Sequence, residues 1–241
     1  MIINLKTNFS FMKVKNKNQD PAFAWEKIFQ KKKKWGEYPS EDLIKFFHKF
    51  FITSSYKKKR IKVLDLGCGP GRNFYFLSKQ KFQVYGCDFS DTALKKAKQN
   101  IIKNKLKNIR LFKTDIRNLT FKKNFFDCVI DDCSSYACSF NETRKIYLDI
   151  SKTLKKNGFF FSSTFSTKSW GDKTGKKIGY NYYLANTGPH KNEGPTRFTS
   201  KKDIFKLFKN LFTLVNLEKT STTYNDQKHS VKKWIIILKK K

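Results

Sequence analysis

The chain has 241 residues, of which 39% are hydrophobic and 25 are Phe, enough for one sizeable core and too many for a disordered chain. Its formal net charge of +33 favours anionic partners, and nucleic acid is the obvious one. The 46 Lys, however, far outnumber the six Arg and are spread over the whole chain. Because Arg is the residue that grips phosphate and guanine, we interpret the charge as compositional bias and expect no specific nucleic acid partner.

The apolar and cysteine-containing segments argue against a secreted or membrane-bound protein. The longest apolar runs, such as Trp234–Leu238, are far too short to span a bilayer, and residues 1–20 lack the apolar stretch of a signal peptide. The five Cys are odd in number, and no His completes a zinc set around the evenly spaced Cys128, Cys133 and Cys138. We therefore predict a reduced, cytoplasmic protein with no metal and no membrane partner, either a monomer or a homodimer.

The N-terminal quarter predicts helices. Residues 1–20 are polar and rich in Lys and Asn, typical of a loose arm. Apolar periodicity then predicts one helix over about Ala22–Lys34 and a second over about Glu41–Phe51, for which Ser40 is a good N-cap.

From Ile61 the pattern becomes an alternation of strands and helices. This alternation predicts βαβ units and a mostly parallel sheet. The predicted strands are Ile61–Leu66, Phe82–Cys87, Ile109–Lys113, Phe126–Asp131 and Phe159–Ser163, and the predicted helices are Gly71–Lys79, Thr92–Lys103 and about Glu142–Leu154, the last ended by Asn157 and Gly158.

The stretch Ser166–Thr199 interrupts this rhythm with Gly, Pro and aromatic residues and no clear periodicity. A segment this long is usually functional or disordered, and its aromatic content favours function. After it, Ser200 and Asp203 form an imperfect capping box for another helix. Leu211–Leu217 and Val231–Leu238 then predict two final strands that pair antiparallel.

The most informative motif is a glycine-rich turn between a strand and a helix, Asp65-Leu66-Gly67-Cys68-Gly69-Pro70-Gly71-Arg72-Asn73. Glycines let the backbone turn tightly and pass close beneath a ligand. The spacing G-x-G-x-G differs from the dinucleotide fingerprint, since Arg72 occupies its third Gly position, and no Lys-Ser/Thr follows as in a phosphate-binding P-loop.

Acidic residues end four successive predicted strands: Asp65, Asp88, Asp115 and Asp131. Any one of them is explained as a solvated loop residue or a helix cap. Because the carboxyl ends of parallel strands meet at one edge of a sheet, four together predict a ligand site there. A carboxylate about 20 residues after the glycines can accept both hydroxyl protons of a ribose, so the pattern favours nucleoside binding.

With these motifs, residues of about 60–165 resemble the core of class I S-adenosylmethionine-dependent methyltransferases. The resemblance implies an α/β fold, a doubly wound, mostly parallel seven-stranded sheet of order 3-2-1-4-5-7-6 with strand 7 antiparallel and helices on both faces. It implies residues 56–241 as the methyltransferase domain, with an insertion at about 166–199, and residues 1–55 as an N-terminal arm and helical lid. S-adenosyl-L-methionine is then the cofactor and S-adenosyl-L-homocysteine the product.

The resemblance also assigns residues to parts of the cofactor. It implies that Asp65, Gly67, Gly69 and Gly71 line the methionine and ribose, with Cys68 and Asn73 in the same loop. It implies that Asp88 holds the ribose, that Phe89 lies against the adenine, that Asp115 and Ile116 reach the adenine, and that Asp131 borders the methionyl end.

The stretch from Trp25 to Pro39 resembles, more loosely, the leader of small-molecule methyltransferases related to thiopurine and tellurite enzymes, in which aromatic residues cap the cofactor. This implies such a role for Trp25 and Trp35, although packing of an N-terminal helix explains them equally well. Tyr38 is a candidate to hold the acceptor.

Acceptor chemistry is predicted less directly. A hydroxyl acceptor benefits from a base, and of the three His, we choose His190 in the aromatic insertion. Arg197 is a candidate clamp for a substrate carboxylate, with a structural ion pair as the alternative. We predict methyl transfer to a small molecule, with the accepting atom open. The alternatives are an RNA methyltransferase, suggested by the charge, and a non-catalytic S-adenosylmethionine-binding protein. The sequence Asp131-Asp132-Cys133-Ser134 departs from the D/N-P-P-Y/F/W motif of base and amide methylation.

Overall fold

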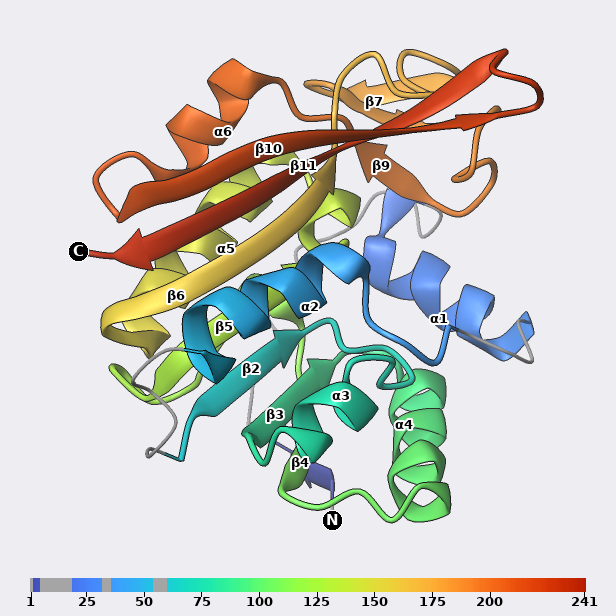
Figure 1. Cartoon of the computed structure of the whole chain (residues 1–241). Helices are drawn as coiled ribbons and strands as arrows, with labels where there is room; N and C mark the ends of the chain where they lie inside the picture. The colour runs from blue at the N-terminus through green and yellow to red at the C-terminus, as the bar shows by residue number, and fades with distance from the viewer. Residues whose placement is uncertain (1, 5–18, 32–35, 54–59) are drawn as a thin grey trace.

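The computed structural model describes residues 2–4, 19–31, 36–53 and 60–241. One large twisted sheet crosses the molecule, and a small sheet lies beside one end of it (Figure 1). The strands of the large sheet are β1 (Ile2–Asn4), β2 (Lys62–Leu66), β3 (Gln83–Asp88), β4 (Ile109–Lys113), β5 (Phe126–Asp132), β6 (Leu154–Phe165), β10 (Phe212–Tyr224) and β11 (His229–Lys240). The helices are α1 (Pro21–Lys31), α2 (Glu41–Phe47), α3 (Phe74–Lys79), α4 (Asp91–Lys103), α5 (Phe140–Thr153) and α6 (Lys201–Phe208).

The large sheet has the strand order β1-β4-β3-β2-β5-β6-β11-β10. Strands β1 to β6 are parallel, and β11 is antiparallel to both of its neighbours, β6 and β10. Without β1, this is the predicted order 3-2-1-4-5-7-6 with its antiparallel strand, so the predicted fold is confirmed. The prediction of a loose arm over residues 1–20 is wrong for Ile2–Asn4, whose backbone adds an eighth strand parallel to β4.

Helices cover both faces of the sheet, as predicted. On one face, apolar side chains of α2, α3 and α4 pack against the strands around Val63, Val84 and Ile130. On the other face, α5 and α6 pack against Leu64, Val129 and Phe160. In Figure 1 the first group lies in front of the sheet and the second behind it. The edge formed by the carboxyl ends of β2–β5 remains available for a ligand.

Most element boundaries lie close to the predicted ones, and the clearest difference is that β6 begins earlier than the predicted Phe159. The second helix continues past α2 as a π-helical turn over His48–Ile52, which accounts for the whole predicted range. Helix α5 (Phe140–Thr153) matches the predicted helix of about Glu142–Leu154, but Asn157 and Gly158 do not end it, because the chain enters β6 directly at Leu154 and both residues lie in that strand. The capping box of Ser200 and Asp203 is present in α6.

The stretch Ser166–Thr199 is ordered by a small antiparallel sheet of three short strands. These are β7 (Lys176–Gly179), β8 (Tyr182–Leu184) and β9 (Pro195–Arg197). A buried aromatic group including Tyr183 and Phe198 fixes this sheet against the main one. Between β8 and β9 the chain makes a loop that contains His190.

Within the described ranges, no helix is long and apolar enough to cross a membrane. The five Cys are all free thiols. The same residues contain no group of three or more His, Cys, Asp or Glu side chains placed to hold a metal ion.

Candidate active site

The glycine loop connects β2 to α3 and requires glycine at its turning points. Gly67 has φ of +63°, and a Cβ there would lie 2.6 Å from Oγ of Ser134. Gly71 has φ of +84°, and a Cβ there would lie 2.3 Å from the ring of Phe74. Gly67, Cys68 and Gly69 line a cavity, whereas Gly71 shapes the turn beneath them. Because these glycines have no side chain, a ligand in the cavity can approach the backbone of the loop closely, as the motif predicts.

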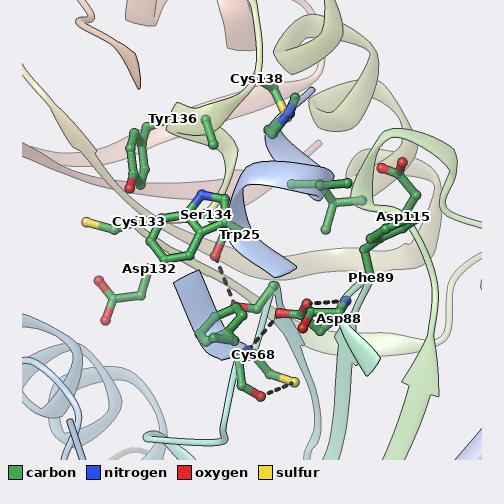
Figure 2. Close-up of a pocket in the computed structure, with 18 of the residues that line it drawn as sticks. Trp25, Cys68, Asp88, Phe89, Asp115, Asp132, Cys133, Ser134, Tyr136 and Cys138 are labelled. Atoms are coloured by element: carbon green, nitrogen blue, oxygen red, sulfur yellow. Dashed lines mark hydrogen bonds between the residues drawn. The ribbon is translucent and has the colours of Figure 1, made fainter. Parts of the chain in front are cut away.

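The cavity lies at the carboxyl ends of β2–β5 and has a volume of about 230 Å³. Of the residues that the sequence assigns to the cofactor, those that line it are Asp65, Gly67, Cys68, Gly69, Asn73, Asp88, Phe89, Asp115 and Ile116. In Figure 2, Asp88 lies near Cys68, Phe89 and Asp115 lie on one side, and Asp132, Cys133 and Tyr136 lie on the other.

Asp88, at the end of β3, is held in place by backbone amides. Its Oδ2 accepts a hydrogen bond from the Gly69 amide and its Oδ1 from the Ser90 amide, each at 2.9 Å. Burial raises its pKa to about 6, although these hydrogen bonds favour the charged form. The carboxylate therefore ties the second strand end to the glycine loop and offers its remaining lone pairs to the cavity.

Asp65, at the end of β2, is paired with Asn73 of the same loop. The Asn73 side-chain amide donates to both carboxylate oxygens at 3.2 Å. The carboxyl is 2% exposed, and burial raises its pKa to about 7. A buried carboxylate of this kind favours a nearby positive charge.

The raised pKa of Asp65 predicts a pH-dependent contribution to stability. Since its folded-state pKa lies above the ordinary value of 3.8, the protonated form stabilises the fold, and this contribution is lost as pH rises through about 7. We expect Asp65→Asn to become more stable relative to the wild type as pH rises from 5 to 8. The free energy of unfolding of both proteins is measured in urea without ligand. A variant whose stability falls relative to that of the wild type over this range would contradict the assignment.

The end of β4 presents Asp115 together with Arg117. The carboxylate caps a short turn by accepting from the Arg117 backbone amide at 2.8 Å, and the guanidinium donates to both of its oxygens at 2.6–3.0 Å. The same guanidinium lies 3.2 Å from Asp20, just before α1. Although burial opposes it, these carboxylates raise the pKa of Arg117 further. Asp115 thus lines the cavity, as predicted for a ligand-binding residue, and already has a cationic partner in Arg117.

At the end of β5, two adjacent acids have different environments. Asp131 is fully buried and accepts hydrogen bonds from the amides of Ser134 and Ser135 and from the hydroxyls of Ser135 and Ser162. It does not line the cavity, so the structure does not bring it together with the other residues predicted to bind the cofactor. Its neighbour Asp132 lines the cavity and forms an ion pair with Arg72. The strand alternation turns the first acid inward, so that Asp131 positions the turn that carries Ser134.

Helix α1 forms one wall of the cavity. Trp25 and Phe29 line it, and the Phe29 ring lies against Gly69, where an added Cβ would come within 3.3 Å of it. The helix is fastened by Glu26, which accepts hydrogen bonds at 2.5 Å from the hydroxyls of Ser90 and Thr92. Burial opposes this charge, but the hydrogen bonds outweigh it and lower the pKa of Glu26. Trp25 therefore lines the same cavity as the glycine loop, whereas Trp35 is outside the described residues.

The far end of the cavity, beside the end of β5, is aromatic. Trp25 meets Tyr136 edge to face, with ring centroids 6.5 Å apart, and Figure 2 shows both near Cys133. The His190 ring lies 5.0 Å from that of Tyr136. Glu193 follows in the same loop and also lines the cavity. The predicted base is thus at the site, brought there from a segment far along the chain.

The other residues predicted for the acceptor lie elsewhere. Arg197 is 2% exposed, does not line the cavity, and donates to the carbonyl of Cys138 and the hydroxyl of Thr199. Burial lowers its pKa. Its guanidinium joins β9 to the turn after β5, so it is not placed to clamp an acceptor. Tyr38 is 72% exposed and also lies outside the cavity lining.

The remaining aromatic residues of the insertion are structural as well. The Tyr182 hydroxyl donates to the carbonyl of Ala137, Tyr180 donates to Asp203, and Trp170 stacks on His229 at 4.3 Å. They fix the insertion to the core and thereby hold the loop that carries His190. Six further lining residues were not predicted from the sequence: Arg72, Arg117, Asp132, Ser134, Tyr136 and Glu193. Asp132 and Ser134 could have been predicted, because they follow directly after the predicted strand Phe126–Asp131.

Comparison with known proteins places the chain in a family. A model described as a methyltransferase domain matches residues 57–225. The ubiquinone biosynthesis O-methyltransferase of Pelagibacter ubique is 30% identical over 165 residues, which cover 68% of this chain and 66% of that protein. Human EEF1A lysine methyltransferase 2 is 33% identical over 133 residues, covering 52% and 54%.

Solved structures agree in fold. An S-adenosylmethionine-dependent methyltransferase from Methanosarcina mazei superposes with a TM-score of 0.60 at 17% identity, over 76% of this chain and 93% of that one. The chain spans only part of some curated relatives, 57% of one and 34% of another. With the glycine loop, the strand order and the family match taken together, the chain belongs to the class I S-adenosylmethionine-dependent methyltransferases.

Proposed function

We propose that the protein transfers a methyl group from S-adenosylmethionine to a small-molecule acceptor. The cosubstrate supplies an activated methyl group on a sulfonium, so the protein's task is to bind, orient and desolvate the two reactants. In this proposal Gly67–Gly69 and Asp65 lie against the methionine and ribose, Asp88 binds the ribose, and Phe89, Asp115 and Ile116 surround the adenine. The acceptor lies at the aromatic end, next to Tyr136 and His190.

The charge of the cavity lining is the main observation that supports this acceptor class. The described residues that line it include five acids, two Arg and no Lys, in a chain with 46 Lys. The acids are Asp65, Asp88, Asp115, Asp132 and Glu193, and the bases are Arg72 and Arg117. A cavity with excess negative charge attracts a sulfonium and an ammonium and repels phosphates. This supports a small acceptor that is uncharged or cationic over RNA.

Cofactor binding and methyl transfer test the proposal in sequence. Calorimetry should show binding of S-adenosylmethionine and S-adenosylhomocysteine, with no comparable binding of NAD or ATP. The protein is then incubated with labelled S-adenosylmethionine and a cell extract separated into metabolite, protein and RNA fractions. We expect label in the metabolite fraction. Binding without transfer to any fraction would favour the non-catalytic alternative, and label confined to protein or RNA would contradict a small-molecule acceptor.

The interpretation of the surface charge has its own expected result. RNA should bind weakly and without sequence preference, and its affinity should fall steeply as salt rises, because binding rests on counterion release. Fluorescence anisotropy with several unrelated RNAs at 50 and 200 mM salt measures this. Tight binding of one structured RNA at physiological salt would favour the RNA methyltransferase alternative.

A further inference from the structure

The loop between β8 and β9 brings an imidazole into the acceptor end of the cavity. His190 lines the cavity beside Tyr136, and its ring also meets Phe165 at 4.3 Å between centroids. The loop is held over the site by contact with the first helix, since a Cβ on Gly194 would come within 2.5 Å of the Ala24 side chain. The imidazole is therefore enclosed between the insertion and α1.

The contacts of His190 distinguish its two ring nitrogens. Nδ1 lies 3.5 Å from Oε2 of Glu193 and 3.4 Å from the hydroxyl oxygen of Tyr136. A carboxylate only accepts hydrogen bonds, whereas the Tyr136 hydroxyl can either donate or accept, so the carboxylate favours the tautomer with the proton on Nδ1. Nε2 is buried and, among the described residues, has no hydrogen-bond partner. In that tautomer Nε2 carries a lone pair that a proton donor in the cavity would satisfy.

The neighbouring titratable groups are poorly suited to take a proton. Burial raises the pKa of Tyr136 well above its ordinary value, and the nearby Glu193 carboxylate raises it further. Burial likewise raises the pKa of the Cys133 thiol to about 11. Asp132 is paired with Arg72. Imidazole is the commonest general base near neutral pH, and here a carboxylate orients it, as in other nucleophile-activating arrangements.

We propose that His190 is the general base for a hydroxyl acceptor and that Glu193 positions its ring. The protein is then an O-methyltransferase for an uncharged, ring-bearing alcohol or phenol. The inference rests on the proposed function and adds the accepting atom and the acceptor class to it. The aromatic faces of Trp25 and Tyr136 suit a ring, and the excess of acids in the lining disfavours a carboxylate or phosphate on the acceptor.

The reaction balances without any further reagent. The acceptor hydroxyl donates a hydrogen bond to Nε2, and its oxygen forms the new bond to the methyl carbon of S-adenosylmethionine. The bond between that carbon and sulfur breaks, and its electron pair remains on sulfur, which becomes the neutral thioether of S-adenosylhomocysteine. The hydroxyl proton passes to Nε2, and Glu193 stabilises the resulting imidazolium through Nδ1–H. Release of that proton to solvent restores the base. Glu193 is thus a positioning residue and His190 the catalytic one.

The tautomer can be tested on the protein alone. Nitrogen-15 NMR of histidine-labelled protein, with His190→Ala used for assignment, reports which ring nitrogen bears the proton. We expect the neutral ring of His190 to be protonated on Nδ1 and the wild-type signal to shift in Glu193→Gln. A neutral ring protonated on Nε2 would overturn the proposal whether or not an acceptor is known.

The accepting atom is tested by the labelled product and by a matched panel of substituted phenol, aniline, thiophenol and benzoate with one ring pattern. We expect the methyl group on oxygen in the extract product and, within the panel, transfer to the phenol. His190→Ala should lower kcat at least 100-fold and Glu193→Gln about 10-fold, the range for a general base and its orienting partner. The Kd of S-adenosylmethionine should stay within twofold in both, and added imidazole should partly rescue His190→Ala.

His48→Ala, which alters an exposed histidine far along the chain from this loop, serves as the control and should leave turnover unchanged. Transfer to nitrogen, sulfur or carbon, or normal turnover by His190→Ala, would overturn the inference while leaving the methyltransferase proposal intact. Absence of cofactor binding would overturn the proposed function itself.

Discussion

Replacing Asp88 by Ala is expected to weaken binding of S-adenosylmethionine by about 1–3 kcal/mol, or roughly 10- to 100-fold in Kd. The carboxylate offers charged acceptors to ribose hydroxyls in a buried setting, where loss of the acceptor leaves those hydroxyls unpaired. It also orders the glycine loop through the Gly69 amide. Isothermal titration calorimetry with S-adenosylmethionine and S-adenosylhomocysteine measures the effect, which should be similar for both because they share the ribose.

Asp91→Ala is the matched control for this experiment. Asp91 has the same charge and begins the neighbouring helix α4, but its side chain is 73% exposed and pairs with Lys113 outside the cavity. Its removal should change Kd less than twofold. If both variants bind alike, the ribose assignment is wrong. Binding by wild type should also weaken below about pH 6, because protonation of Asp88 removes the charged acceptor.

Replacing Asp131 by Ala is expected to lower the free energy of unfolding by about 3 kcal/mol, since up to four buried donors lose their acceptor and each unsatisfied one costs about 1–3 kcal/mol before relaxation. For a chain of this size the fall in Tm should be roughly 6–12 °C. The donors come from the turn after β5 and from β6, so the variant loosens the part of the core that carries Ser134. Thermal and urea unfolding measure the change.

The adjacent Asp132→Ala is expected to give the opposite pattern. The pair of variants therefore distinguishes a role in stability from a role in the cavity. Asp132 touches the cavity, and its main partner is the half-exposed Arg72. We expect a loss of less than about 1 kcal/mol in stability, as for partly exposed ion pairs, together with a measurable fall in methyl transfer. A larger stability loss in Asp132→Ala than in Asp131→Ala would show that the two roles are reversed.

Much of the cavity lining around the glycine loop could be predicted because it is encoded locally. The glycines of residues 67–71 are required by backbone angles within the turn itself, and Asp65 and Asp88 each end a strand whose apolar pattern is visible in the sequence. Parallel strands place their carboxyl ends at one edge, so strand order and local motif together bring these residues into one cavity. The fold class could be predicted for the same reason, because the alternation of strands and helices is also visible in the local sequence pattern.

The lining of the other end of the cavity was decided by tertiary structure. Which of Asp131 and Asp132 faces the cavity depends on the donors that Ser135 and Ser162 supply, and those come from two other segments. Arg197 has the chemistry of an anion clamp, yet its guanidinium is buried against the carbonyl of Cys138, 59 residues away.

His190 and Tyr136 are 54 residues apart, and no periodicity links them. The short strands β7–β9 have little pattern of their own, because they are held by packing against the main sheet rather than by local propensity. The sequence by itself therefore determined the fold and the cofactor, whose residues act through local backbone geometry. Only the tertiary structure decided which side chains line the aromatic end of the cavity, because those contacts join α1, the end of β5 and the loop before β9 across long sequence distances.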